Sequence, residues 1–162
     1  MKLKLNLLIV AFVLITCGCS NQDYYFEKYR SLPNYWHKDS IVRFDFEIQD
    51  TAATYNLFLN IRANNKYPFS NIYLITNLED STAVVKRDTL EYVMASPDGK
   101  MLGNGFSDIK ESMLWYKENY KFNAKGNYTI HIEQALRKRN EVEGVERLDG
   151  VSEVGFSIQK IK

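Results

Sequence analysis

Alternation of apolar and polar side chains with a period of two is the feature that most constrains this chain of 162 residues. In residues 42–48, valine, phenylalanine and isoleucine occupy every second position and charged residues stand between them. Successive side chains of a β-strand point to opposite faces, so this stretch predicts a half-buried strand. Residues 72–75 are apolar on both faces, as in a central strand. The alternation recurs in residues 55–61, 90–94, 128–132 and 154–158.

Seven or so such strands, separated by turn residues, predict an all-β fold. Glu111–Phe122 suits either a strand or a helical turn, and its tryptophan and tyrosines favour the strand. Gln134–Arg139 is expected to form a short helical turn, and Arg137–Asp149 an exposed charged loop. The predicted architecture is an antiparallel β-sandwich of jelly-roll or immunoglobulin-like type. A lipocalin-like barrel is the alternative, because its strands alternate in the same way.

The first 18 residues have the pattern of a lipoprotein signal peptide. Two lysines precede the apolar run Leu7–Ile15, which is shorter than the roughly 20 residues that a spanning helix needs. Gly18 then precedes Cys19 and favours cleavage there, with acylation (palmitate) of the Cys19 thiol. Cys17, with the aliphatic Leu14 three positions before it, is the less favoured site, and an ordinary cleaved signal is the remaining alternative.

This interpretation divides the chain into the signal peptide, a tether over residues 19–31 and one domain over residues 32–162. The aromatic residues of the tether are expected to dock on the domain as an irregular first segment, and contact with a membrane surface or a partner is the alternative. Removing 18 of 162 residues leaves 144, and removing Lys2 and Lys4 from 21 basic groups leaves 19 against 20 acidic ones. A balance so close to zero argues against nucleic acid as a partner. With its one remaining cysteine acylated, the domain has no disulfide, thiolate nucleophile or cysteine metal site.

Residues with catalytic or metal-binding chemistry are sparse. The two histidines, His37 and His131, make a poor metal set without cysteine, and no serine stands in a G-x-S-x-G elbow. We therefore expect no enzyme activity, no cofactor and no metal. Asp followed by Ser or Thr suits turn capping, and the same pattern resembles an O-glycosylation signal of exported bacterial proteins. The candidate acceptors are Ser40, Thr51, Ser81 and Thr89.

The segment Arg62–Asp108 contains more turn chemistry than strand connection requires. It includes Y-P-F-S-N-I-Y-L at 67–74, D-T-L-E at 88–91 and G-N-G-F-S-D at 103–108. These motifs resemble the gliding-motility lipoprotein family of Bacteroidetes, GldH. The resemblance extends from the Trp36 region to the end of the chain. It departs mildly at Leu136, where methionine is commoner, and in a longer loop at 139–149.

The resemblance implies a lipoprotein of the outer envelope that is needed for gliding and for the associated type IX secretion machinery. It supplies no catalytic residues. We expect the chain to act by contacts with envelope proteins, anchored in the outer membrane and facing the periplasm, because residues 20–23 lack the acidic cluster that resembles a surface-export signal. Loops held by a rigid sandwich are where binding usually occurs. The candidate partner-binding residues are Tyr67, Asn71, Asn104 and Asp108.

A second functional hypothesis comes from a different class. A β-sandwich can bind carbohydrate or another ligand by stacking it on exposed aromatic rings. The candidate rings are Trp36, Phe58 and Trp115. A shallow groove with exposed rings would favour sugar, whereas an apolar patch or a bare sheet edge would favour protein.

Overall fold

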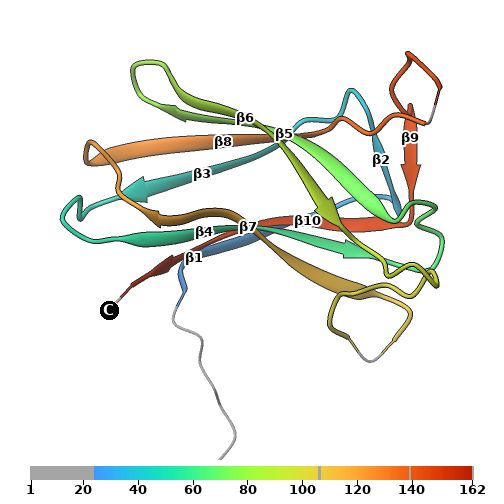
Figure 1. The fold of residues 1–162 in the computed structure, drawn as a ribbon. Helices are drawn as coiled ribbons and strands as arrows, with labels where there is room; N and C mark the ends of the chain where they lie inside the picture. Colours follow the sequence, from blue (N-terminus) through green and yellow to red (C-terminus); the bar gives the residue numbers. More distant parts are fainter. Residues whose placement is uncertain (1–23, 106, 139, 162) are drawn as a thin grey trace, which may run out of the picture.

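Ten strands joined by turns and loops make up the computed structural model, which describes residues 24–105, 107–138 and 140–161 (Figure 1). No helix in this part of the chain is long and apolar enough to cross a membrane. The strands are β1 (Tyr24–Ser31), β2 (Tyr35–His37), β3 (Val42–Ile48), β4 (Tyr55–Ala63), β5 (Asn71–Asp80), β6 (Val84–Val93), β7 (Lys110–Tyr120), β8 (Gly126–Gln134), β9 (Arg147–Asp149) and β10 (Val151–Lys160).

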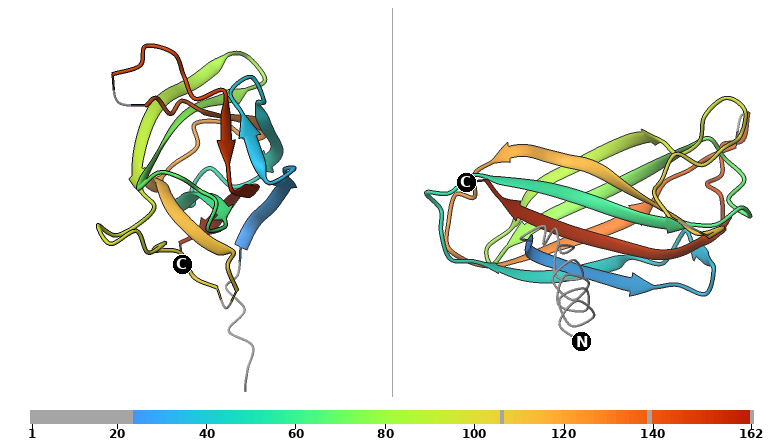
Figure 2. Two further views of the ribbon diagram at one scale, coloured as in Figure 1. Left: turned by 90° about the vertical axis from the view of Figure 1, so that its right-hand side faces the viewer. Right: turned by 90° about the horizontal axis from the view of Figure 1, so that it is seen from below.

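The strands form two four-stranded antiparallel sheets and one small ribbon. Sheet A has the order β1-β10-β4-β7, sheet C the order β3-β8-β5-β6, and β2 pairs with β9 as sheet B. Sheets A and C face each other as two layers, and sheet B lies at one end (Figures 1 and 2). Among the described strands, the edges of sheet A do not pair with those of sheet C. The predicted sandwich is therefore confirmed, and the alternative of a closed barrel is wrong.

The core lies between sheets A and C and follows the predicted alternation. All four apolar residues of β3 are buried, and the three charged residues between them are exposed. Tyr128, Ile130 and Ile132 of β8 are buried in register with them. Phe46 is at the centre of an aromatic cluster, with its ring centroid 5.4 to 6.0 Å from four other rings. These rings belong to Phe26, Phe122, Tyr128 and Phe156.

Two uncertain segments have different outcomes. The segment Glu111–Phe122 was predicted as a strand, and β7 confirms it over Lys110–Tyr120. The helical turn predicted at Gln134–Arg139 is wrong for the described residues, 134–138. The side chain of Gln134 explains why, because it accepts a hydrogen bond from Leu136 N (3.1 Å) and donates one to Val145 O (2.6 Å). These backbone groups thus have partners without a helix.

The N-terminal boundary differs from the predicted one. Residues 24–31, which were expected to belong to the tether, form β1 and pair with β10 along its length. The aromatic residues of this segment explain the difference, because the Phe26 ring packs on Phe46 at 5.5 Å and on Phe156 at 6.1 Å. The domain therefore includes Tyr24. The signal peptide, Cys17 and Cys19 lie outside the described residues.

Sheet B was not predicted, because its strands have only three residues each. Trp36 of β2 is fully buried and donates its indole N–H to Ser40 O at 2.7 Å. Beside it, the guanidinium carbon of Arg147 lies 4.0 Å from the centroid of the Tyr35 ring. The charged loop expected over Arg137–Asp149 therefore ends in a strand whose Leu148 is buried in the core.

Candidate functional site

Two turn-rich segments, residues 64–71 and 94–105, meet at one end of the sandwich, on the right in Figure 1. Met94 N and Ala95 N both donate hydrogen bonds to Ser70 O, at 2.7 and 3.1 Å. Leu102 N donates to Met94 O at 2.9 Å, and this hydrogen bond attaches the turn between the two residues to the same unit. Residues 64–71 and 94–105 therefore form one unit, here called the motif end.

The motif end encloses an open recess of about 350 Å³. Tyr67 is 7% exposed and donates its hydroxyl to Asn71 O at 2.6 Å, while burial raises the pKa of Tyr67 well above its usual value. Its ring makes an edge contact with Phe69 at 6.2 Å. Apolar side chains and polar groups thus both line the recess. The lining residues are Asn65, Tyr67, Pro68, Phe69, Ser70, Ala95, Gly99 and Met101.

The backbone of Gly150 contacts the motif end. Its φ is 84°, a region that residues with a Cβ rarely adopt, and a Cβ there would lie 2.3 Å from Tyr67 N. Gly150 O accepts from Asn64 N at 2.8 Å, and Gly150 N donates to Asn34 O at 2.9 Å. The backbone of the turn at residues 64–67 therefore packs directly against the backbone of Gly150.

The four predicted partner-binding residues do not share one surface. Tyr67 is in the core, and Asn71 donates its amide to Glu91 Oε1 of sheet C at 2.8 Å. Asn104 exchanges two 2.8 Å backbone hydrogen bonds with Glu111 and lines recesses on the sheet A side. Asp108 is exposed in the same loop. Their role in binding stays a prediction.

The outer face of sheet A has a polar cluster that sequence reasoning missed. Arg62 of β4 lies between two carboxylates, with its Nε 3.1 Å from Glu111 Oε2 and its Nη1 bonded to Glu153. The guanidinium carbon is also 4.3 Å from the centroid of the Tyr29 ring, whose hydroxyl donates to Glu111. Burial and the hydrogen bond to Glu111 raise the pKa of Tyr29 far above its usual value. These residues, Tyr29, Arg62, Glu111 and Glu153, are the arginine cluster.

Small residues on the two central strands make room for this cluster. Gly155 of β10 lies under the Tyr29 ring, and a Cβ there would be 2.6 Å from Tyr29 Cδ1 and 3.2 Å from Asn60 Cβ. Beside it, the amide of buried Asn60 donates to Ser157 Oγ at 2.9 Å. The one sequence signal for this arrangement is a glycine inside an otherwise apolar strand, which marks a close approach.

Gly155→Ala is expected to lower the free energy of unfolding by about 1–2 kcal/mol, because the added methyl group collides with the Tyr29 ring. The same substitution in a Tyr29→Ala background should cost much less, so that the two changes are coupled by roughly 1 kcal/mol. Urea denaturation of the four proteins measures this coupling. Additive effects would mean that Tyr29 does not lie over Gly155.

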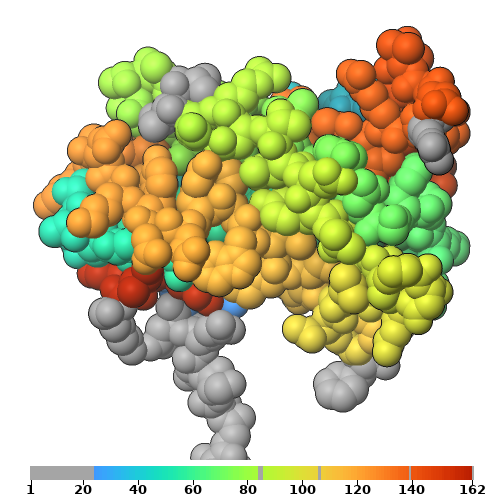
Figure 3. All heavy atoms as spheres, in the orientation of Figure 1, coloured from blue at the N-terminus to red at the C-terminus, as the bar shows by residue number. Residues whose placement is uncertain are grey.

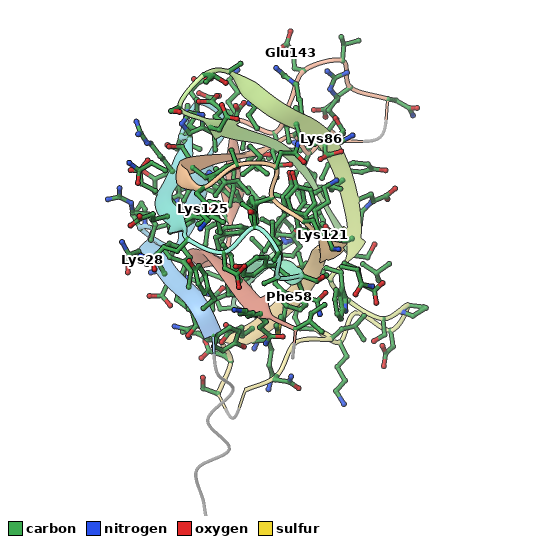
Figure 4. All side chains as sticks on the ribbon, turned by 90° about the vertical axis from the view of Figure 1, so that its left-hand side faces the viewer. Lys28, Phe58, Lys86, Lys121, Lys125 and Glu143 are labelled. Carbon is green, nitrogen blue, oxygen red and sulfur yellow. The ribbon has the colours of Figure 1, made fainter. Side chains whose placement is uncertain are left out.

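An exposed apolar strip borders the arginine cluster. Nine large apolar residues are exposed in the described part of the chain, and five of them gather here. Trp115 of β7 is 53% exposed and packs at 4.5 Å on Phe58, which is only 3% exposed and is labelled in Figure 4. Phe58 therefore lies on the outer face of sheet A but is covered by Trp115. The apolar strip consists of Val93, Leu102, Ile109, Met113 and Trp115.

The sugar-stacking trio is not present as one surface. Trp36 is fully buried in the core, so the prediction that it stacks on a ligand is wrong. Phe58 is covered, and Trp115 alone of the three is exposed. One exposed ring does not form a groove in which a sugar could stack.

The other predicted sites are dispersed. Of the candidate glycosylation residues, Ser40, Ser81 and Thr89 are exposed and Thr51 is half-buried. Asp50 Oδ1 accepts from Ala52 N at 3.0 Å, as expected for a capped turn, and the glycosylation itself stays a prediction. No group of three or more His, Cys, Asp or Glu that could hold a metal occurs among the described residues.

Comparison with known families identifies the family to which the chain belongs. The family model described as GldH lipoprotein matches residues 24–158, from β1 to β10. The chain belongs to the GldH lipoprotein family. The matched region of the GldH family includes the motif end, the arginine cluster and the apolar strip.

Two curated relatives agree with the GldH family. The gliding motility lipoprotein GldH of Flavobacterium johnsoniae is 49% identical over 95% of this chain and 94% of its own length. The GldH homolog of Christiangramia forsetii is 43% identical over 99% of this chain and 98% of its own. Among solved structures, dimeric latent PorU from Porphyromonas gingivalis is similar with a TM-score of 0.35 and 7% identity, over 89% of this chain and 14% of that one.

Proposed function

We propose that this chain is a non-catalytic, lipid-anchored component of the gliding and type IX secretion machinery and acts by binding envelope proteins at the motif end. The observation that carries the proposal is the single recess that Tyr67–Ser70 and Ala95–Met101 build together. Its lining combines apolar and aromatic side chains with polar groups, a combination that suits a side chain of another protein. The names of the two relatives support the link to gliding.

The predicted anchor supports the same proposal. An acyl chain contributes about 0.8 kcal/mol per buried methylene, so acylation of Cys19 would hold the domain at a membrane. The partner then meets the motif end at the membrane surface. We place the anchor in the outer membrane, with the domain facing the periplasm.

Met101→Glu tests the proposal, because it places a carboxylate in the wall of the recess. In Flavobacterium johnsoniae cells that lack the relative, the unchanged chain should restore gliding and the variant should not. Envelope proteins that co-purify with the unchanged chain should be lost from the variant, since an unpaired charge desolvated in an interface costs several kcal/mol.

Val142→Glu is the matched control, because Val142 is 84% exposed and does not line the recess. It should restore gliding and retain the same co-purifying proteins. Thermal melts of both variants should stay close to that of the unchanged chain. Retention of gliding and of all partners by a folded Met101→Glu variant would contradict binding at the motif end.

A further inference from the structure

We propose that the outer face of sheet A lies against the lipid bilayer, with the apolar strip in the headgroup region. This inference rests on acylation of Cys19 and is independent of what binds the motif end. In this proposal, the bilayer surface is the ligand of the outer face of sheet A. No second layer of the described part of the chain packs on that face.

The length of chain before β1 is the first reason. Tyr24 is the fifth residue after Cys19, so at roughly 3.3–3.6 Å per residue the two Cα atoms are at most about 18 Å apart. The sheets of a sandwich are about 10 Å apart, with a further layer of side chains outside each. If sheet C faced the bilayer, the tether would need to stretch almost fully past both layers. With sheet A next to the bilayer, it needs to span only one layer of side chains.

The position of Tyr24 indicates which face of the domain lies next to the start of the described chain. Its side chain lies on the outer face of sheet A, where its hydroxyl is 4.0 Å from Met113 Sδ and the ring helps to line a recess beside Arg62. The described chain therefore begins beside the apolar strip. The loop that contains Leu102 and Ile109 projects beyond sheet A on the same side, in yellow at the lower right of Figures 1 and 3.

The chemistry of the strip fits the bilayer interface. Tryptophan and tyrosine are enriched at this depth, because their rings are apolar and their N–H or O–H groups can stay hydrated. Trp115 and Tyr24 have this character, and the strip adds aliphatic side chains without a charge. The charged groups on this face include the arginine cluster, where Arg62 is paired with both Glu111 and Glu153, and the exposed Glu27, which lines the same recess.

The outer face of sheet C has the opposite character. The outward residues of β3 are Arg43, Asp45 and Glu47, and all three are exposed. On β6, Arg87 and Glu91 are exposed as well. Val93, at the end of β6, belongs to the strip. Desolvation of so many charges would oppose contact with lipid, so sheet C is the face that stays in water.

The two tryptophans allow a direct test, since Trp115 is on the proposed contact face and Trp36 is fully buried in the core. The full acylated chain is reconstituted into vesicles of phosphatidylethanolamine and phosphatidylglycerol that contain a lipid brominated near the headgroup. Trp115 should lose about half of its emission, and the Trp115→Phe variant, which reports Trp36 alone, should lose almost none.

Thr89→Trp in the Trp115→Phe background is the control for orientation, because Thr89 is exposed on sheet C. Its emission should be unaffected by the brominated lipid. Equal quenching at both positions would mean that the domain tumbles on its tether, and stronger quenching at position 89 that it lies the other way round. Either result overturns the proposal, as does protein that fails to float with the vesicles. Unquenched Trp115 in floating protein also overturns it and favours a protein on the strip.

Discussion

Replacing Phe46 with alanine is expected to lower the free energy of unfolding by about 3–5 kcal/mol. Phe46 is 5% exposed, and its ring contacts four other aromatic rings that come from both sheets and from the turn after β7. Its removal therefore loses apolar burial and leaves a cavity that rigid neighbouring rings cannot fill. Urea denaturation followed by tryptophan fluorescence measures the effect.

Glu47→Ala is the control for Phe46→Ala, because Glu47 is the next residue of β3 and is exposed. Its cost should stay under about 1 kcal/mol. Similar costs at the two positions would mean that β3 does not present Phe46 to the core. The comparison holds strand, register and neighbours constant and changes only the face of the sheet.

Gly150→Ala is expected to lower the free energy of unfolding by about 2–4 kcal/mol, through strain at positive φ and a collision with backbone. The added methyl group would lie 2.3 Å from Tyr67 N and 2.8 Å from Lys66 C. Main-chain atoms cannot rotate away, so the turn at 64–67 must shift and the recess of the motif end must change shape. Thermal unfolding measures the first effect, and partner co-purification the second.

Gly99→Ala separates the two causes, because Gly99 has the same φ of 84° but nothing within 4 Å of the added Cβ. Its cost should be about 1 kcal/mol, from conformational strain alone. If Gly150→Ala cost no more than Gly99→Ala, the close approach to Tyr67 would play no part in stability.

The sequence predicted the layers of this fold but not its edges. Alternation identifies β3, β8 and β10 directly, because a half-buried strand shows its period within a few residues. In β1 that period is obscured, since Tyr24, Tyr25 and Phe26 are consecutive, and a bulge lies between Tyr24 and Phe26. Strands of three residues, such as β2, are too short to show any period.

The functional surfaces were less predictable than the core. Turn residues near Tyr67 and Gly103 pointed to the motif end, because glycine and proline determine backbone conformation locally. The arginine cluster joins β1, β4, β7 and β10, whose order in the sheet cannot be read from any one strand. The partners of Arg62, Glu111 and Glu153, are distant from it in sequence and become its neighbours only through that order.

The pairing of β1 with β10 determines when this domain can finish folding. In this pair Tyr24 lies opposite Gln159, so the two strands that complete one side of sheet A are almost the whole domain apart in sequence. Closing so long a loop is entropically unfavourable and slows folding. A chain that leaves the cytoplasm N-terminus first delivers β1 early and β10 last. Until the final residues arrive, β1 has no partner and β4 has one open edge, so a chaperone that covers exposed strands would have its longest opportunity on these two strands.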